Sequence, residues 1–568
     1  MTAQAPLPPA SRRWLFGPRS DLLLGCGGAY GIAFAAQTLA PDTMRELLPM
    51  WIFPFVTLVL GAPHYGATLI RAYGTQEARR RYAALGIWLT AVLVIAYAVG
   101  VRNVLVGSAI VTLYVAWSPW HYSGQNYGVA MTFLRRRGVP VSPWAKRLVH
   151  ASFVSSYLLT LLALFGPARQ GYAPASYQGT VYQLLPIGLP AGTHALAFAL
   201  AAAVYAVCVI GAAVLLLRAA PRARELAPVG LLALTQALWF AGPTVARHWS
   251  VGSGLDPFAP GNAAYSFMWV ASGHFVQYLW ITSYYAGASG GGALTRYLGK
   301  ALLVGSVAWT LPALVFAPGM LGALPFDMGL GLLTAAVVNL HHFVLDGAIW
   351  KLRDGRIARV LLLAQPAEER FSPLDQRLAR WGRPLVLGIG ALCVAVSLVG
   401  FVESEFGARR AAASGDFARM LRAAERAERV GRASPRFHVH LARMAAERGD
   451  RGSALAHLQR SLDLWPTPEA WTELARWHEQ GLAWKEAAEA RRKAVELAPQ
   501  DASLHYQLGL AWMRLGETRK ARDAFARAVE LAPDESLPRR NLERAEALLA
   551  RQEGSDGRAL AGTANPVD

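Results

Sequence analysis

Long apolar segments fill the N-terminal two thirds of the chain and limit what this part can fold into. An α-helix rises ~1.5 Å per residue, so about 20 apolar residues cross the ~30 Å hydrocarbon core of a bilayer. In lipid, a backbone must form its hydrogen bonds internally, which favours a bundle of helices. Residues 21–403 are therefore predicted to form an all-α, multi-pass transmembrane domain. Its eleven predicted segments are Leu22–Ala40, Leu47–Ile70, Tyr82–Val99, Val104–Phe133, Leu148–Phe165, Thr193–Leu217, Pro228–Ala246, Ala263–Tyr285, Ala301–Phe316, Gly329–Trp350 and Leu385–Val402.

Basic residues are distributed unequally between the two sides of these segments. If residues 1–20 form a cytoplasmic segment, the cytoplasmic side collects 25 Lys/Arg and the opposite side collects four. Cytoplasmic loops of membrane proteins carry an excess of Lys and Arg. We therefore expect a bacterial inner-membrane protein with a cytoplasmic N-terminus, and eleven crossings place the C-terminal region outside the cytoplasm. The same bias explains the net charge of +19, so nucleic acid is not expected as a partner.

Charge and cysteine content indicate which kinds of domain and site the chain contains. The chain is 54% hydrophobic and only 16% charged, whereas soluble proteins carry about 25% charged residues. Charged residues of both signs become dense only after Phe406, which predicts a soluble C-terminal domain. The three cysteines, Cys26, Cys208 and Cys393, lie singly in apolar segments. Their spacing fits neither a disulfide framework nor a zinc site, and the chain has no nucleotide-binding motif.

The C-terminal domain, predicted over residues 404–552, repeats itself with a period of 33 to 34 residues. The phrase KAVELAP at Lys493–Pro499 recurs as RAVELAP at Arg527–Pro533. Small residues at matching positions allow close helix packing, large ones fill the gap, and proline ends the second helix of a pair. The residues that carry this pattern are Ala454, Ala487, Ala521, Pro466, Pro499, Pro533, Leu508, Gly509, Trp512, Phe525 and Ala528.

This pattern resembles the tetratricopeptide repeat (TPR) family over about Pro435–Pro533, which implies an α-solenoid. The middle unit departs from the pattern where Arg491 stands at the position of Phe525. Leu537–Arg551 is expected to cap the array, and residues 553–568 to form a disordered tail. Such arrays usually bind a protein or peptide on their concave face, and a spacer without a ligand is the alternative.

Histidines occur well inside four of the apolar segments, where polar groups are costly and often functional. They are His64, His121, His274 and the adjacent pair His341 and His342. All lie on even-numbered segments, which run in the same direction and place the imidazoles at similar depth. We therefore expect these imidazoles to meet, with only one of the adjacent pair facing the centre.

Polar neighbours accompany these histidines at helical spacing. Gln125 lies four residues after His121, Gln277 three after His274, and Asp346 four after His342, so each pair shares a helix face. Asn339 precedes the histidine pair by two residues. These groups are predicted to be additional ligands or partners that fix the tautomer of an imidazole.

Several imidazoles beside one carboxylate suit non-haem Fe(II) and oxygen chemistry. The absence of a C-x-x-C-H motif gives no support for covalently attached haem. The alternatives are hydrogen bonds that hold helices together and a proton or ion pathway. The same residues therefore leave two further functions open, a scaffold that works through its repeat domain and an ion- or proton-coupled transporter.

Two of the histidine motifs resemble a known family. Gly61–Ala67, with the sequence GAPHYGA, and Trp120–Gly124, with the sequence WHYSG, are similar to segments of the bacterial and archaeal membrane β-carotene dioxygenases (Brp/Blh). The resemblance implies a non-haem iron enzyme that cleaves a long apolar polyene with O₂. It also implies His64, His121, His274 and either His341 or His342 as iron ligands. Thr68 stands near the position where that family has an acidic residue.

These observations lead to one leading hypothesis. The chain is expected to be a membrane-embedded, histidine-ligated oxidoreductase, with Fe(II) as its cofactor, acting on an apolar or lipid-like substrate. Its repeat domain is expected to recruit a protein partner outside the cytoplasm.

Overall fold

The computed structural model describes residues 13–166, 179–186, 188–248, 263–288, 293–350, 355–363 and 373–561, and every regular element in these ranges is helical. The chain divides into two compact units. The first comprises residues 1–316, 320–322 and 329–401, and the second comprises residues 317–319, 323–328 and 402–568. The change of unit at residue 402 lies close to the composition change noted above.

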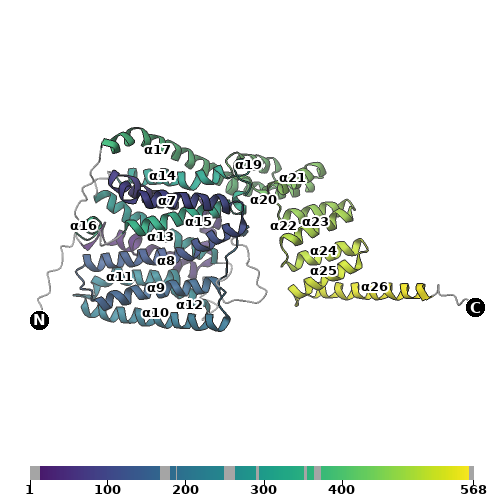
Figure 1. Ribbon diagram of the computed structural model, residues 1–568, viewed down its shortest axis with the longest axis horizontal. Coiled ribbons are helices and arrows are strands. Elements are labelled where there is room, and N and C mark those ends of the chain that lie inside the picture. The colour runs from purple at the N-terminus through teal and green to yellow at the C-terminus, as the bar shows by residue number, and fades with distance from the viewer. Residues whose placement is uncertain are drawn as a thin grey trace, which may run out of the picture. The chain divides into compact units, whose positions relative to one another are not determined.

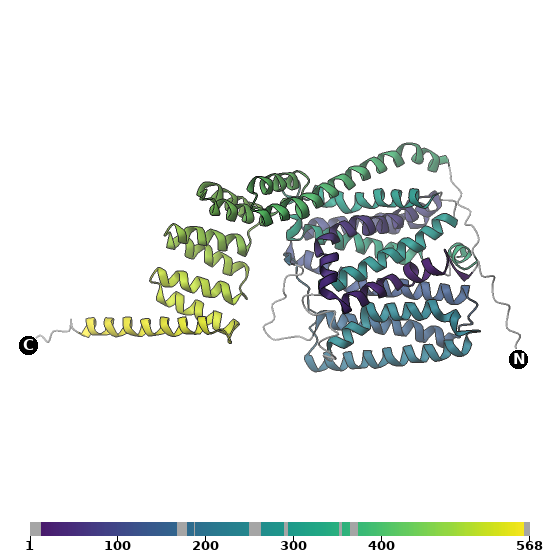
Figure 2. The same cartoon turned by 180° about the vertical axis from the view of Figure 1, so that it is seen from behind.

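The first unit consists of parallel and antiparallel helices packed side by side (Figures 1 and 2). Its helices are α2 (Pro18–Ser20), η1 (Asp21–Gly25), α3 (Gly28–Leu39), α4 (Pro41–Leu47), η2 (Met50–Ile52), α5 (Phe53–Val56), η3 (Thr57–Gly61), α6 (Ala62–Tyr73), α7 (Gln76–Gly100), α8 (Val104–Arg136), α9 (Pro143–Phe165), α10 (Ala191–Ala219), η5 (Ala223–Leu226), α11 (Ala227–Gln236), η6 (Ala237–Ala241), α12 (Gly242–His248), α13 (Ala263–Ala288), α14 (Leu294–Val315), α15 (Leu330–Ile349), α16 (Gly355–Leu363) and α17 (Pro373–Phe401).

Each of the eleven predicted segments is formed mainly by helix in its described residues. Nine helices in the described part of the chain are long and apolar enough to cross a membrane: Phe53–Tyr73, Glu77–Gly100, Val104–Arg136, Pro143–Phe165, Ala191–Ala219, Ala223–Ala246, Leu294–Val315, Leu330–Ile349 and Gly382–Ser414. The first predicted segment is a pair of helices, Pro18–Gly25 and Gly28–Leu39, bent by 57° at Gly27. The eighth is α13, which is not among the nine. That these helices cross a membrane stays a prediction.

The ends of the long helices are set by polar caps. Asn103 accepts a hydrogen bond from the backbone N–H of Val106 at 3.1 Å, which begins α8. Ser142 caps α9 through Ala145 in the same way at 3.1 Å. A capping side chain satisfies one of the backbone N–H groups that the first turn of a helix leaves unpaired.

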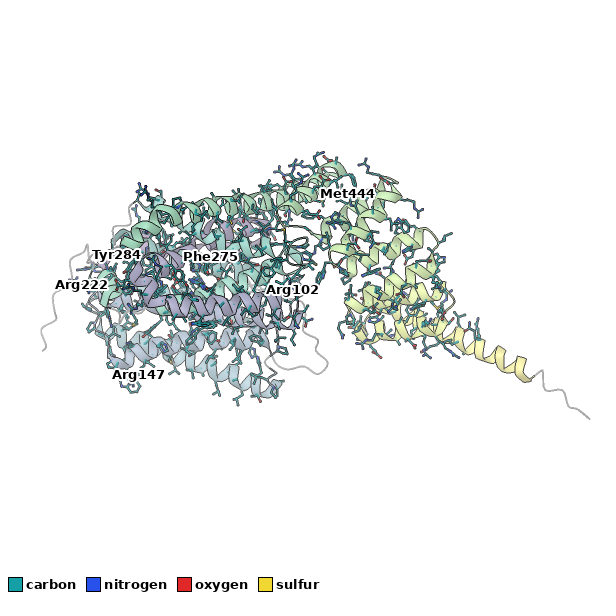
Figure 3. The ribbon with its side chains drawn as sticks, turned by 45° about the horizontal axis from the view of Figure 1, so that its top comes forward. Arg102, Arg147, Arg222, Phe275, Tyr284 and Met444 are labelled. Atoms are coloured by element: carbon teal, nitrogen blue, oxygen red, sulfur yellow. The ribbon has the colours of Figure 1, made fainter. Side chains whose placement is uncertain are left out.

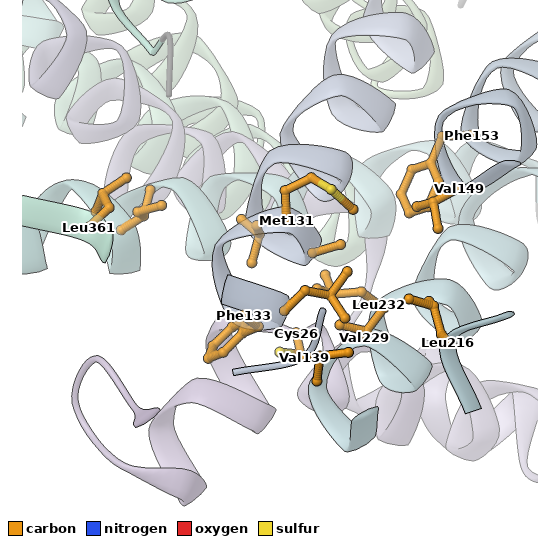
Figure 4. Packing of buried hydrophobic residues seen from close by; sticks show 14 of the residues in the cluster. Cys26, Met131, Phe133, Val139, Val149, Phe153, Leu216, Val229, Leu232 and Leu361 are labelled. Carbon is orange, nitrogen blue, oxygen red and sulfur yellow. The ribbon is translucent and has the colours of Figure 1, made fainter. Parts of the chain in front are cut away.

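Charged side chains mark the two ends of the first unit. Figure 3 shows Arg147 and Arg222 at one end and Arg102 at the other. That the first of these ends faces the cytoplasm stays a prediction. Much of the interior between them is apolar. Cys26, for example, is fully buried in a cluster with Phe133, Val139 and Leu232, so it is a packed thiol (Figure 4).

Helices α6 and α14 are so close that only glycine fits at two positions of their contact. A Cβ atom added to Gly66 would overlap the carbonyl oxygen of Ala301, and one added to Gly305 would overlap the carbonyl oxygen of Ala62. Small residues permit this contact, as they do in many membrane helix pairs. The contact lies one helical turn or less from His64.

The second unit stacks pairs of antiparallel helices (Figure 1). Its helices are η7 (Phe326–Met328), η8 (Val402–Ala408), α18 (Arg409–Ser414), α19 (Phe417–Arg429), α20 (Pro435–Glu447), α21 (Arg451–Leu464), α22 (Pro468–Gln480), α23 (Trp484–Leu497), α24 (Ala502–Arg514), α25 (Thr518–Leu531) and α26 (Ser536–Ala561). Pro466, Pro499 and Pro533 each stand two residues after the second helix of a pair. Helix α26 runs past residue 552, where the repeat domain was expected to end, and residues 562–568 lie outside the described part.

The repeat residues occupy the positions expected of them. Ala454, Ala487, Ala521, Phe525 and Ala528 are at most 1% exposed. Leu508 and Gly509 are also buried, Trp512 is partly buried, and a Cβ atom added to Gly509 would overlap the ring of Phe525. Large and small residues therefore interlock between α24 and α25, as the sequence predicts.

Arg491, which replaces the large apolar residue in the middle repeat, is also buried. Its Nη2 lies 3.0 Å from Glu479 Oε1, and its Nη1 donates to Gln507. Because a buried cation must be paired, these two side chains allow the middle repeat to depart from the family pattern.

Candidate metal centre

Four imidazoles from four different helices meet inside the first unit. His64 comes from α6, His121 from α8, His274 from α13 and His342 from α15. The ring centroids of His64 and His342 are 4.3 Å apart, and those of His64 and His274 are 4.8 Å apart. The centroid of His121 lies 4.8 Å from that of His342 and 5.0 Å from that of His274. All four are at most 8% exposed.

Two overlapping sets of ligand atoms occur within this cluster. His64, His274 and His342 form one set, and His121, His342 and Asp346 form the other, with ligand atoms in each set within 4.8 Å of one another. The Nε2 atoms of His121 and His342 are 3.1 Å apart. Asp346 Oδ2 lies 3.8 Å from His121 Nε2, which places one carboxylate beside the imidazoles.

Several ring nitrogens of this cluster have no hydrogen-bond partner among the described residues. They are Nε2 of His64 and both ring nitrogens of His274, all inaccessible to solvent. A buried polar group without a partner costs about 1–3 kcal/mol. A transition-metal ion would satisfy such nitrogens, because neutral imidazole is a common ligand.

The separation of the two facing nitrogens is compatible with one shared ion. Metal–imidazole bonds are about 2.0–2.1 Å long, and two such bonds at about 100° would end about 3.1 Å apart. The Nε2 atoms of His121 and His342 are 3.1 Å apart. The donor set therefore fits a transition metal by its chemistry and by this distance.

His341 lies outside the cluster, although it was a candidate ligand. Its Nδ1 is 2.8 Å from the hydroxyl of Tyr65, and its Nε2 is 2.9 Å from Thr90 Oγ1. Both ring nitrogens are therefore engaged elsewhere. Adjacent residues on a helix point about 100° apart, so only His342 of the pair faces the other imidazoles.

The amide candidates form a network of their own. Gln125 Nε2 donates to Gln277 Oε1 at 2.6 Å, and Gln277 Nε2 donates to Asn126 Oδ1 at 2.9 Å. Asn339 donates to the backbone carbonyl of Ala335 at 2.8 Å. In the described part of the chain, the predicted companions Gln125, Gln277 and Asn339 form no hydrogen bond to an imidazole. Of the four predicted companions, the structure brings only Asp346 to the histidines.

Three residues outside the predicted set of ligands and imidazole partners connect the cluster. Thr68 Oγ1 lies 2.9 Å from His342 Nδ1 and 2.6 Å from the hydroxyl of Tyr278. Tyr278 also donates to Asp346 Oδ1 at 2.7 Å, and Trp350 Nε1 donates to Tyr278 at 3.2 Å. A signal for them was present in the sequence. Thr68, Tyr278 and Trp350 each follow a cluster residue by four, which places them on the same helix face.

Aromatic rings enclose the imidazoles. Tyr122 stacks on His274 with centroids 4.1 Å apart, and Phe343 stacks on His121 at 4.5 Å. The ring of Phe275 lies 4.9 Å from that of His64. These rings exclude water and leave an apolar environment around the nitrogens.

The helix that precedes His64 contains a π-helical turn, η3, which ends at Gly61. Such turns insert an extra residue into a helix and often occur at functional sites. Here η3 joins α5 to α6 three residues before His64. The turn changes the direction in which the following side chains point, so it helps to set where His64 lies.

Comparison with known proteins bears on the second unit. Residues 502–535 match the family described as Tetratricopeptide repeat, so the prediction of a TPR array is confirmed. Among solved structures, the chain is similar to the APC/C hetero-tetramer Cut9–Hcn1. The identity is 13%, the match covers 82% of this chain and 93% of that one, and the TM-score is 0.22. No curated protein matches the chain.

Proposed function

We propose that the first unit is a membrane-embedded oxidoreductase with a histidine-ligated transition metal, acting on an apolar or lipid-like substrate. One observation carries this proposal. Four buried imidazoles converge from four helices, and three of their nitrogens have no hydrogen-bond partner in the described structure. The apolar helices around them favour a substrate that enters from lipid.

The unpartnered nitrogens argue against the two simpler roles for these histidines. If the imidazoles only held helices together, each would bond a neighbouring helix, as His341 does with Tyr65 and Thr90. A proton pathway also needs hydrogen bonds from group to group, and His274 makes none within the described residues. Metal ligation accounts for the arrangement directly.

The residues of the cluster define what the site can do. His64, His121, His274 and His342 would hold the ion, with Asp346 as a carboxylate beside them. Imidazole and carboxylate with open positions suit Fe(II), which supplies oxygen activation when bound. The rings of the surrounding aromatic residues keep water away from the reacting groups. The resemblance to membrane β-carotene dioxygenases supports the same class of reaction.

Metal analysis of the purified, detergent-solubilised protein tests this proposal. We expect about one transition-metal ion per chain in the wild type and almost none in the His121→Ala/His274→Ala double variant, because two of the nitrogen ligands are lost. His150→Ala is the control, since His150 packs on Tyr127 away from the cluster. A wild-type protein without stoichiometric metal would remove the proposal.

The confirmed repeats favour a second candidate function, that of a membrane-anchored adaptor. TPR arrays bind proteins or peptides, so the second unit is a protein-interaction domain. If all eleven segments cross the membrane, the N- and C-termini lie on opposite sides, and we infer that this domain faces away from the cytoplasm. Deletion of residues 404–552 separates the candidates. An adaptor loses all function, whereas an enzyme keeps its bound metal.

A further inference from the structure

A chain of hydrogen bonds surrounds the histidine cluster, and its donors can be assigned atom by atom. The Tyr278 hydroxyl contacts Thr68 Oγ1 at 2.6 Å, Asp346 Oδ1 at 2.7 Å and Trp350 Nε1 at 3.2 Å. An indole N–H can only donate, and Asp346 Oδ1 accepts the bond from the Tyr278 hydroxyl. The single phenolic proton therefore goes to Asp346. Tyr278 consequently accepts a proton from Trp350 and another from Thr68.

This assignment determines the direction of the next bond. The one hydroxyl proton of Thr68 is used in the bond to Tyr278. Thr68 Oγ1 must therefore accept from His342 Nδ1, which is 2.9 Å away. His342 consequently carries its proton on Nδ1 and keeps a lone pair on Nε2. That Nε2 atom is the one that faces His121 at 3.1 Å.

We propose that Thr68 and Tyr278 are positioning residues that hold His342 in the tautomer needed to bind the metal. This inference rests on the proposed function. Imidazole ligands commonly donate their second N–H to an oxygen, which fixes the ring and raises its basicity. Here the oxygen is a threonine hydroxyl that is itself oriented, through Tyr278, by Asp346.

Burial makes this chain of bonds effective. Thr68 and His342 are fully buried, and Tyr278 is 1% exposed. Water therefore cannot replace a missing partner, so loss of the Thr68 hydroxyl leaves His342 Nδ1 without an acceptor. The imidazole is then free to rotate or to place its proton on Nε2, and either change removes a lone pair from the site.

Titration of Co²⁺ into the chelator-stripped, full-length protein tests the role of Thr68. Visible absorption of bound Co²⁺ reports the ligand set, and the titration reports the affinity. We compare wild type, Thr68→Val and Thr68→Ser. The control is Thr132→Val, because among the described residues the Thr132 hydroxyl bonds only the carbonyl oxygen of Gly128 on its own helix.

We expect Thr68→Val to weaken Co²⁺ binding by about 10- to 100-fold and to change the absorption spectrum. Thr68→Ser keeps the hydroxyl and should bind as wild type does, as should Thr132→Val. Equal affinity and spectrum for Thr68→Val and Thr68→Ser would overturn the inference. If the wild type itself binds no Co²⁺, the proposed function fails, and this inference fails with it.

Tyr278→Phe provides a second variant in case Thr68→Val does not fold. It keeps the ring but removes the acceptor of the Thr68 proton, so that hydroxyl can turn and donate to His342 Nδ1. We expect weaker Co²⁺ binding than in wild type. Wild-type affinity and spectrum in this variant would contradict a positioning role for Tyr278.

Discussion

At the scale of single residues, His274 shows most clearly why the cluster favours a metal ion. Its ring is fully buried, and Tyr122 stacks on one face at 4.1 Å. Neither ring nitrogen has a partner among the described residues. Leaving such groups unpaired costs about 1–3 kcal/mol each, and an ion shared with three other imidazoles offsets this cost.

The adjacent histidines of α15 provide a direct comparison between a ligand and a structural residue. We predict that His342→Ala abolishes metal binding, because its Nε2 faces the cluster. His341→Ala should retain the metal but lose about 1–2 kcal/mol of stability, since the bonds to Tyr65 and Thr90 disappear. Metal stoichiometry and thermal unfolding of both variants check this. Equal metal loss in the two would show that the positions are not distinct.

A buried histidine of the repeat domain predicts a dependence of stability on pH. Burial, and then the neighbouring His457, lower the pKa of His438 from 6.5 to about 4. The folded domain therefore holds His438 neutral, whereas the unfolded chain protonates it below its ordinary pKa. The resulting stability is complete above pH ~6.5 and is lost as the pH falls towards 4. At about 1.4 kcal/mol per pKa unit, this difference is at most about 3 kcal/mol.

Thermal unfolding of the second unit, followed in the full-length protein between pH 7 and pH 4.5, measures this effect. The His438→Asn variant keeps a polar group near the position of Nδ1 but cannot be protonated in this range. We expect its melting temperature to fall less steeply with pH than that of the wild type. Identical slopes would show that His438 does not cause the dependence.

Sequence spacing located the histidines but not their partners. A helix face is readable from spacing, whereas the neighbour that this face meets depends on how the helices pack. For this reason Gln125 and Gln277 bond each other, although each shares a face with a histidine. Thr68 and Tyr278 have the same spacing, but a threonine or a tyrosine inside an apolar segment is common in any helix, so the spacing alone did not mark them as partners of the histidines.

At the scale of elements, apolar length predicts where helices occur but not their irregularities. The first segment bends by 57°, and a π-helical turn precedes His64. Both features depend on local backbone geometry that hydropathy does not detect. The repeat helices were more predictable, because alanines and prolines recur at fixed positions. Arg491 is an exception to that pattern. Its partner Glu479 lies on the other helix of the same repeat, so the pairing depends on how the two helices pack.

The close contact between α6 and α14 leads to a prediction about the element that carries His64. Gly305→Ala would push a methyl group into the backbone of Ala62, so we expect a loss of about 1–3 kcal/mol or more. Gly299→Ala is the matched control on the same helix, because no atom of the described residues lies within 4 Å of its added Cβ atom. Thermal unfolding in detergent compares the two variants. Similar stability in both would mean that the helices are not in close contact.

At the scale of the whole molecule, composition alone separates the two units. The apolar part holds the histidine cluster, and the charged part holds the confirmed repeats. Under the proposed function, the apolar surroundings of the cluster favour a lipid-soluble substrate, and the repeats favour a protein partner.

X-ray absorption at the edge of the bound metal, measured on the purified full-length protein, tests the central claim most directly. We expect nitrogen scatterers at about 2.0–2.1 Å, with the outer-shell pattern of several imidazoles, and loss of that pattern in the His121→Ala/His274→Ala variant. The absence of a metal edge above background, or an ion without imidazole scattering, would contradict a histidine-ligated metal centre.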